Sequence, residues 1–396
     1  MTRVLLASVS ARGFAESAAR AGYEVVAVDG FGDLDLLACA AAVHVVRVGE
    51  GGGGGAGGGG GRFSARAAAA AVRDLSGEAA VYGASFENHP AAVRGLAAHR
   101  ELWGNPPRVL ARARDPRRLA RVVGDAGLSS PRVRLARPPL GTRSQWLVKP
   151  LRSGGGDGVT VWRRGAPVPH GSYFQERIAG VAGSIVFAAD GRHAVPLGLS
   201  RILAGEAAFG ADGFRYCGSI LGSAGDPQFA ADDRLLGRAT LLAEEVTRAF
   251  GLVGVNGVDF IARRGVPYAI EVNPRYTAAM ELVERAYGLS VFDVHVRACR
   301  GALPAFDLAA VRRRTPDAVG KAVVYARRPS VLGDTRLWLA DPDVRDISPP
   351  GTTFATREPI CTIFARQQDA SACFAALTCR AARLYREVEG REARSA

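Results

Sequence analysis

The pattern of apolar residues changes near residue 130. Before that point, apolar runs such as 3–8 and 23–28 alternate with a segment of helical spacing at 10–22. This alternation is typical of a parallel sheet covered by helices. After residue 145 the apolar runs are short, and turns containing glycine join them, which indicates antiparallel strands. The sequence therefore predicts an α/β part followed by an α+β part.

A glycine tract interrupts the first part of the chain. Residues 51–61 are all glycine except Ala56, so this tract cannot form a core element, and we interpret it as a flexible surface loop. It does not resemble a phosphate loop, which needs a few fixed glycines between a strand and a helix.

Asp115-Pro116 is a good start for a helix that ends near Ala126, because aspartate is a good N-cap residue and proline fits the first turn of a helix. We place the boundary at about 105–130.

Composition excludes some classes of protein. The chain has 396 residues, and its 51 basic and 38 acidic residues give a formal charge of +13. Only two of the basic residues are lysines, and the arginines are dispersed, which favours a solvated surface over a nucleic-acid partner; small phosphates remain suitable partners. The six cysteines are scattered without a CxxC pair. Together with the absence of a secretory pattern or a membrane-length apolar run, this predicts a cytoplasmic protein with no membrane partner.

The first motif that carries chemistry surrounds Lys149. The apolar run 146–148 delivers this lysine at its end, and Ser153-Gly154-Gly155-Gly156-Asp157-Gly158 follows. Glycines let backbone N–H groups approach an anion closely, and an ammonium group is a compact charge for a phosphate. A tight hairpin with a surface lysine remains the alternative. The scarcity of lysine favours the functional interpretation, whereas Lys321 has no such context and is interpreted as structural.

The second motif is a predicted hairpin over 255–262 and 267–272. Asp259 lies within the first strand, and Glu271 and Asn273 are two residues apart on the second, so both point to one face. Pairing across the turn can bring Asp259 to that face. Two carboxylates and an amide oxygen suit Mg²⁺, and Arg275 can neutralise a phosphate or an oxyanion. Arg201, after the strand 194–200, is a further candidate to grip an acyl phosphate or a carboxylate.

A third, weaker motif is FQERIAG at 174–180. Taken in order, LVKP–SGGGDGV, FQERIAG and GVDFIA–YAIEVNPR resemble the ATP-grasp superfamily of ATP-dependent carboxylate–amine ligases over roughly residues 110–300. The resemblance implies a Rossmann-like domain at 1–110 and a two-lobed ATP-grasp domain at 111–300. Its small lobe would span about 130–176 and its large lobe about 177–300. Residues 301–396 would form a C-terminal subdomain that completes the fold.

The resemblance also implies roles for single residues. Lys149 would contact the ATP phosphates and the adenine region, and Arg275 would lie beside the transferred phosphoryl group. Asp259, Glu271 and Asn273 would bind Mg²⁺ or Mn²⁺. The remaining nucleotide contacts would come from a loop that closes over the phosphates (Ser153, Gly154, Gly155, Gly156) and from a hinge that holds adenine and ribose (Gln175, Glu176).

The chain departs from the family in one respect. The family usually has an earlier lysine near the domain junction, and here only Arg114, Arg117 or Arg118 lies in that zone. Arginine can pair with a phosphate, but with different geometry. The stretches SFENHP (85–90) and EVNPRYTAAMEL (271–282) resemble the predicted ATP-dependent carboligase subgroup. Some members of that subgroup accompany genes for folate-like one-carbon cofactors, which implies a role in making such a cofactor.

The implied reaction has two steps: a carboxylate attacks the γ-phosphate of ATP, and an amine then displaces phosphate from the acyl phosphate. Three alternatives stay open. An ATP-grasp kinase would share every nucleotide residue, a nucleic-acid-binding protein would explain the charge, and a nicotinamide oxidoreductase would use the N-terminal unit, although GxGxxG is missing. The substrates would be a small carboxylate and an amine. The sequence leaves their identity open, and it leaves open whether the chain forms a homodimer.

Overall fold

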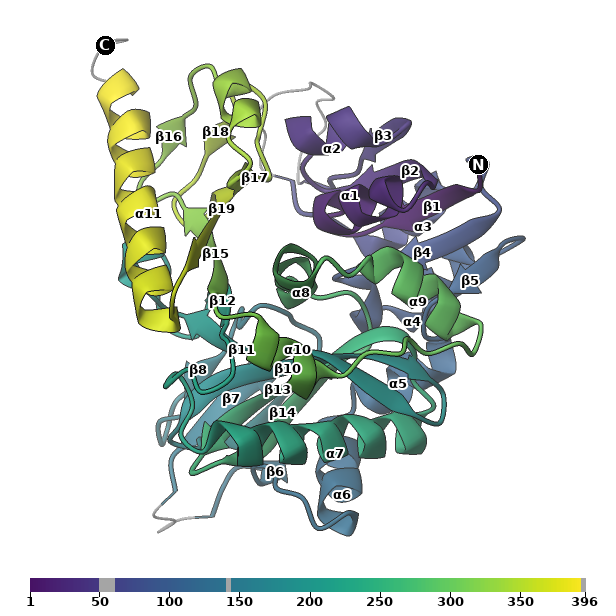
Figure 1. Cartoon of the computed structure of the whole chain (residues 1–396), viewed down its shortest axis with the longest axis vertical. Coiled ribbons are helices and arrows are strands. Elements are labelled where there is room, and N and C mark those ends of the chain that lie inside the picture. The colour runs from purple at the N-terminus through teal and green to yellow at the C-terminus, as the bar shows by residue number, and fades with distance from the viewer. Residues whose placement is uncertain (50–60, 140–143, 393–396) are drawn as a thin grey trace.

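The computed structural model describes residues 1–49, 61–139 and 144–392. The predicted surface loop at 51–61 therefore lies, apart from Gly61, outside the described residues. Across the described ranges, no helix combines the length and the apolar character needed to cross a membrane. The strands form three main sheets, of five, four and eight strands. Helix α11 packs beside the eight-stranded sheet (Figure 1).

The N-terminal sheet is parallel, as predicted. Its strand order is β3-β2-β1-β4-β5. Alternate residues of β1 face opposite sides: Leu6 packs with α1 and α9, and Leu5 packs with α3 and α4. The strands are Arg3–Ala7, Glu24–Asp29, Ala42–Val45, Ala79–Tyr82 and Glu101–Trp103, and the helices are α1 Arg12–Arg20, α2 Leu34–Cys39, α3 Ala65–Ala71, α4 Pro90–Leu96 and α5 Pro107–Ala113.

A small antiparallel sheet follows helix α6 (Pro116–Asp125). Asp115 caps this helix, since its side chain accepts a hydrogen bond from the backbone N–H of Arg117 at 2.9 Å. The sheet has the order β6-β9-β7-β8. Its strands are β6 Val133–Arg134, β7 Trp146–Pro150, β8 Thr160–Val161 and β9 Ser172–Glu176.

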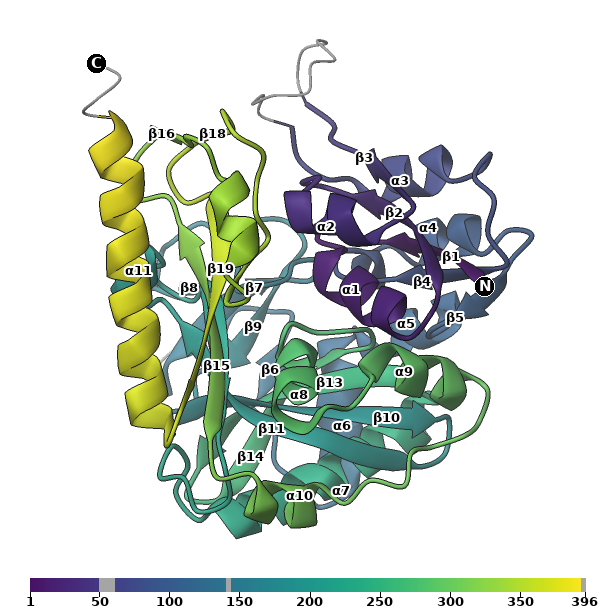
Figure 2. The ribbon, with the colours of Figure 1, turned by 45° about the horizontal axis from the view of Figure 1, so that its top comes forward.

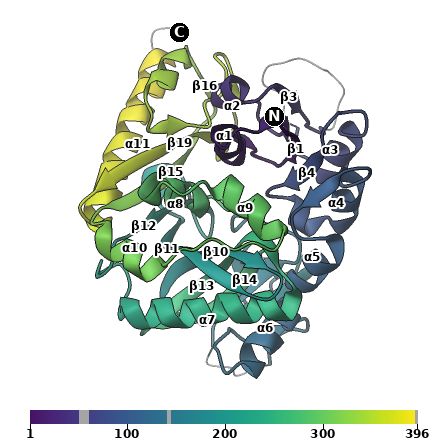
Figure 3. The same cartoon turned by 45° about the vertical axis from the view of Figure 1, so that its right-hand side comes forward.

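The large sheet has eight strands in the order β14-β13-β10-β11-β12-β15-β19-β17. Helix α7 covers one face, while α8 and α9 cover the other (Figure 3). The strands are β10 Val181–Asp190, β11 Ala194–Ala204, β12 Tyr216–Leu221, β13 Val253–Arg263, β14 Val266–Asn273, β15 Ala318–Tyr325, β17 Val344–Arg345 and β19 Pro359–Gln367, and the helices are α7 Asp232–Phe250, α8 Ala279–Tyr287 and α9 Val291–Cys299.

Residues 301–396 are the part expected to complete the fold as a C-terminal subdomain. Strands β15 and β19 pair with each other, and β15 pairs with β12, so residues beyond 300 extend the large sheet. Helix α11 runs to Glu392, and residues 393–396 lie outside the described part. The remaining elements are α10 Leu308–Arg314, β16 Ser330–Val331, β18 Thr353–Phe354 and α11 Ala370–Glu392, with 3-10 helices η1 Phe86–Asn88, η2 Ala207–Phe209 and η3 Arg336–Ala340.

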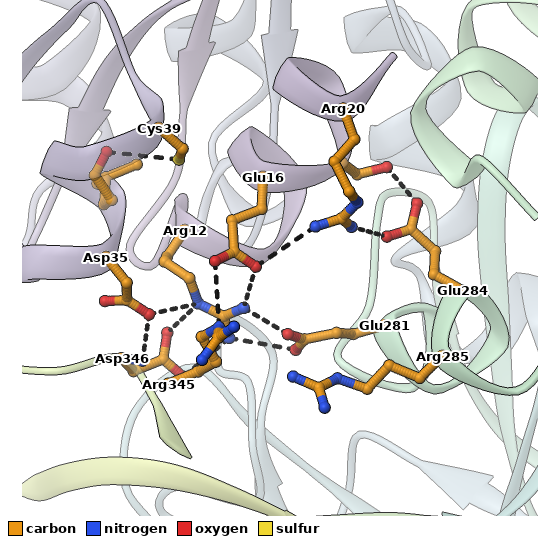
Figure 4. Close-up of polar contacts among 12 residues, drawn as sticks. Arg12, Glu16, Arg20, Asp35, Cys39, Glu281, Glu284, Arg285, Arg345 and Asp346 are labelled. Atoms are coloured by element: carbon orange, nitrogen blue, oxygen red, sulfur yellow. Dashed lines mark hydrogen bonds and ion pairs between the residues drawn. The ribbon is translucent and has the colours of Figure 1, made fainter. Parts of the chain in front are cut away.

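A buried ion cluster joins these parts around Arg12, whose side chain is 2% exposed (Figure 4). The Arg12 guanidinium donates to Asp346 Oδ1 at 2.9 Å, and it also donates to both carboxylate oxygens of Glu281. Lys321 Nζ donates to Glu281 Oε2 at 2.6 Å. Helix α8 therefore lies between α1 and β15 (Figure 2), and the structural role expected for Lys321 is the one it has.

The charges of this cluster depend on one another. Burial raises the pKa of Glu281, but Arg12 and Lys321 outweigh burial and hold it well below its usual range. Arg12 Nη1 also donates to Glu16 Oε2 at 3.2 Å. An oxygen of Asp35 lies 3.5 Å from Arg12 Nε, and the Asp35 carboxylate accepts the backbone N–H groups of Asp346 and Ile347. Arg12 is thus the shared partner of carboxylates from three separated parts of the chain.

We predict that replacing Arg12 with methionine lowers the free energy of unfolding by about 3–5 kcal/mol, because buried carboxylates lose their cation. Arg20→Met is the matched control on the same helix. Arg20 is 57% exposed, so its loss should cost less than about 1 kcal/mol. Urea unfolding at neutral pH measures both variants. Equal losses for the two would contradict a central role for Arg12.

Candidate active site

The hairpin of β13 and β14 brings the three predicted metal ligands together. Asp259 pairs with Glu271 in the strand register, and Asn273 pairs with Gly257. Residues paired across antiparallel strands share a face, and Asn273 Nδ2 donates to Asp259 Oδ2 at 2.9 Å. The turn that joins the strands needs two left-handed residues, Arg264 (φ 53°) and Gly265 (φ 72°). The hairpin thus brings two carboxylates and an amide together on one face.

These groups fit a divalent cation. Burial and the neighbouring Glu271 raise the pKa of Asp259 to about 7, only partly offset by hydrogen bonds from Ser184 and Asn273. Burial would also raise the pKa of Glu271, but the charges of Arg114 and Lys149 lower it. A bound cation would favour the charged form of both carboxylates and so relieve their mutual repulsion. Within the described residues there is no cluster of three or more His, Cys, Asp or Glu side chains that could hold a metal. At this place the third polar group beside the two carboxylates is the amide of Asn273.

Arg275 lies at the end of the same strand. Its Nη2 donates to Asn273 Oδ1 at 3.2 Å, and its Nε donates to Glu87 Oε1 at 2.7 Å. The Arg275 side chain is 11% exposed and that of Glu87 is 1% exposed. Glu87 belongs to η1, directly after β4, at the carboxyl end of the N-terminal sheet. Ligands of open α/β sheets bind at that end, so the ion pair joins the predicted ligand edge to the predicted metal site.

Lys149 and Gln175 reach the site from the small sheet. Lys149 Nζ donates to Gln175 Oε1 at 3.2 Å, and Gln175 Nε2 donates to the carbonyl of Ile270 at 3.2 Å. Ile270 precedes Glu271, so both side chains lie next to the metal-ligand hairpin. The charge of Lys149 acts on the pKa of Glu271, which is further evidence that they are close.

Glu176 does not join this group. In β9 it pairs with Trp146, whereas Gln175 pairs with Leu147, so the two neighbouring side chains face opposite sides of the sheet. The Glu176 carboxylate is held by Arg132, at 3.0 Å to each oxygen, and by Ser144 at 3.0 Å. The expected contact of this carboxylate with ribose is therefore corrected: the backbone of 175–176 can line the site, but the Glu176 side chain lies on the other face.

The glycine-rich loop is docked over the site. The carbonyl of Ser153 accepts from Arg114 Nη2 at 3.0 Å, and the carbonyl of Gly155 accepts from the backbone N–H of Tyr216 at 2.9 Å. Gly156 has φ +76°, and a Cβ there would lie 1.8 Å from the carbonyl oxygen of Phe214. Only glycine can make this approach. Ser153 and Gly154 to Gly156 thus lie where a loop covering the phosphates is expected.

Of the three arginines near the missing lysine, the structure brings only Arg114 into the site. Arg114 Nη1 donates to Glu271 Oε2 at 3.2 Å and to the carbonyl of Val272 at 3.1 Å, and its side chain is 13% exposed. Its Nε is buried without a partner among the described residues. Arg117 and Arg118 instead lie 54–56% exposed beside Asp115.

Arg201 is not brought to the site. In β11 its neighbour Ser200 pairs with Ser184, which in turn pairs with Asp259, so Ser200 shares the face of the carboxylates. Arg201 pairs with Gly183 and therefore points to the opposite face. The geometry gives no support to the expected grip on an acyl phosphate. Strand parity, which can be read from the sequence once the register is known, separates the two residues.

Part of the chain matches a known protein family. Residues 113–279 match a model of the ATP-grasp domain. No curated protein sequence matches the chain. An ADP complex of purK, an N5-carboxyaminoimidazole ribonucleotide synthetase, superposes with a TM-score of 0.66 at 14% identity, over 98% of this chain and 98% of that one.

Two other solved structures superpose over 95% of this chain. The L-amino acid ligase from Bacillus licheniformis gives a TM-score of 0.64 at 14% identity and is covered over 96% of its length. Pyruvate carboxylase from Rhizobium etli gives 0.69 at 13% identity, and this chain spans 37% of it. Residues 113–279 therefore match the ATP-grasp domain, and the superpositions confirm the predicted fold over nearly the whole chain.

We predict that Mn²⁺, used as a probe with ADP, binds more tightly as pH rises from 6 to 7. Below its pKa of about 7, Asp259 carries a proton that the metal must displace, so the apparent affinity should rise roughly tenfold per pH unit and then level off. Electron paramagnetic resonance of free Mn²⁺ measures it. Asp259→Asn should bind weakly and lose this pH dependence; an unchanged profile in that variant would contradict the assignment.

Proposed function

We propose that this chain is an ATP-dependent, ADP-forming ligase that joins a carboxylate to an amine through an acyl phosphate. The observation that carries the proposal is the arrangement at the end of β14. Asp259, Glu271 and Asn273 converge there, and Lys149, Arg114 and Arg275 come to the same place from three elements. A nucleoside triphosphate with its metal requires oxygen ligands for the metal and cationic side chains for the phosphates.

Each group has a part in the proposed reaction. Lys149 and Arg114 would bind phosphate oxygens, and the loop 153–158 would exclude water from them. Arg275 would stabilise charge on the transferred phosphoryl group and then on the acyl phosphate. Mg²⁺ or Mn²⁺, held by Asp259, Glu271 and Asn273, would supply charge neutralisation of the phosphates. Neither step requires a nucleophilic side chain from the protein.

The similar structures support this reaction class. One is an ADP complex of a synthetase, and another is named a ligase for L-amino acids. The resemblance of SFENHP (85–90) and EVNPRYTAAMEL (271–282) to the carboligase-like subgroup supports a narrower proposal, a role in making a folate-like one-carbon cofactor. We expect small-molecule substrates for both halves of the reaction.

The reaction class is tested by ADP release from MgATP, with pools of carboxylates offered with and without amines. We expect ADP only when both are present, and a loss of at least about 100-fold in Lys149→Ala and Glu271→Ala. Glu101→Ala is the matched control, since Glu101 is exposed and pairs with Arg300 away from the site. ADP formed without any amine would replace the ligase with a kinase. A lack of MgATP binding, measured by calorimetry, would overturn the nucleotide site.

We also propose that Arg114 takes the place of the family's earlier lysine. In the structure it bridges Glu271 and the carbonyl of Ser153, so it is poised between the metal ligands and the phosphate loop. Arg114→Ala should raise the KM for MgATP about tenfold or more, because charged hydrogen bonds to phosphate are lost. Arg117→Ala is the matched control and should change it less than twofold. A KM that is unaffected by Arg114→Ala would assign this role elsewhere.

A further inference from the structure

The loop after β4 holds two buried acceptor atoms that have no partner. Glu87 Oε2 and Asn88 Oδ1 are both buried, and neither has a hydrogen-bond partner within the described part of the chain. The two residues are consecutive in η1, and Ser85 before them is held at φ 86°. A buried acceptor without a donor costs about 1–3 kcal/mol, so these two consecutive acceptors need donors from outside the chain, which a water molecule or a ligand can supply.

The other half of each side chain is fixed to the site already described. Glu87 Oε1 accepts from Arg275 Nε at 2.7 Å. Asn88 Nδ2 donates to the carbonyl of Ser153, at the start of the glycine-rich loop, at 3.4 Å. One end of each side chain is therefore anchored beside the residues proposed to hold the acyl phosphate. The remaining oxygen of each side chain, Glu87 Oε2 and Asn88 Oδ1, is left without a donor on the same short segment, η1.

We propose that Glu87 and Asn88 bind the amine substrate and that this substrate is a primary amine. The inference rests on the proposed ligase function and adds the class of nucleophile. A neutral primary amine has two N–H donors and one lone pair. The two donors match the two free acceptors, which leaves the lone pair for the acyl carbon. A carboxylate or phosphate would be repelled by Glu87, and a hydroxyl group has one donor for two acceptors.

The bond changes balance without another reactant. The amine nitrogen forms a C–N bond with the carbonyl carbon of the acyl phosphate, and the C–O bond to phosphate breaks. Inorganic phosphate leaves with the electron pair of that bond. The surplus proton on nitrogen passes to Glu87 Oε2, whose carboxylate is otherwise balanced by Arg275.

Glu87→Gln separates amine binding from the contact with Arg275. The glutamine keeps Oε1 as the acceptor for Arg275, but Nε2 puts a donor where the amine N–H must lie. The probes are free amino acids, amino-acid amides and short diamines, each with its N-methyl derivative, titrated by calorimetry into protein saturated with MgADP and inorganic phosphate. Glu101→Gln, which makes the same change in an exposed pair with Arg300, is the matched control.

We expect at least one primary amine to bind the wild type and the control alike. Glu87→Gln should weaken it by tenfold or more, and N-methylation should weaken it in the wild type. Equal binding by Glu87→Gln and wild type, tighter binding of the N-methyl derivative, or no amine binding while MgADP binds would each overturn the amine site. These results leave the nucleotide site standing. Failure to bind MgADP at all would instead overturn the proposed function.

Discussion

The contact of Arg12 with Glu281 holds the parts of this protein in register. Arg12 begins the first helix, Glu281 lies in α8, and their shared partners Lys321 and Asp346 come from the C-terminal part of the large sheet. Removing so many charges from water is costly, and the geometry offsets that cost only when every partner is present. The cluster is therefore weak evidence for stability in itself and stronger evidence that one arrangement of the three parts is specified.

This arrangement reaches the active site through a short piece of chain. Helix α8 begins four residues after Arg275, and Tyr276 between them stacks on Phe14 of α1 with ring centroids 4.3 Å apart. Fixing α8 against α1 thus fixes the end of β14. Arg275 can then meet Glu87 of the N-terminal part on one side and Asn273 on the other. Three carboxylates (Asp259, Glu271, Glu87) and three cationic side chains (Lys149, Arg114, Arg275) are thereby brought together at the candidate site.

Much of this was predictable from local pattern. The parallel N-terminal sheet, helix α6 at Pro116–Asp125 and the hairpin of β13 and β14 follow from apolar periodicity, capping and turn residues, because each depends on neighbours in the sequence. The errors have one cause: they depend on which face or which partner a strand takes. Glu176 and Arg201 each follow a residue that does face the site, and a shift of one residue along a strand reverses the side chain. The joining of β15 to β12, and the convergence on Arg12, depend on pairings more than 90 residues apart, which no local pattern contains.

The two lysines show how far composition can inform such a site. In a chain that uses arginine almost everywhere, both lysines are found where a single point charge is needed. Lys149 donates to Gln175 beside Glu271. Lys321 is 4% exposed and approaches one oxygen of a carboxylate that Arg12 already contacts through both oxygens. A second planar guanidinium would compete with Arg12 for that carboxylate, whereas an ammonium needs one oxygen and stacks over Phe364 at 5.2 Å. Rarity together with the neighbouring glycines singled out Lys149 in the sequence, whereas Lys321 lacked such a context. The structure adds which carboxylate Lys321 meets, and so shows that this lysine belongs to the cluster around Arg12.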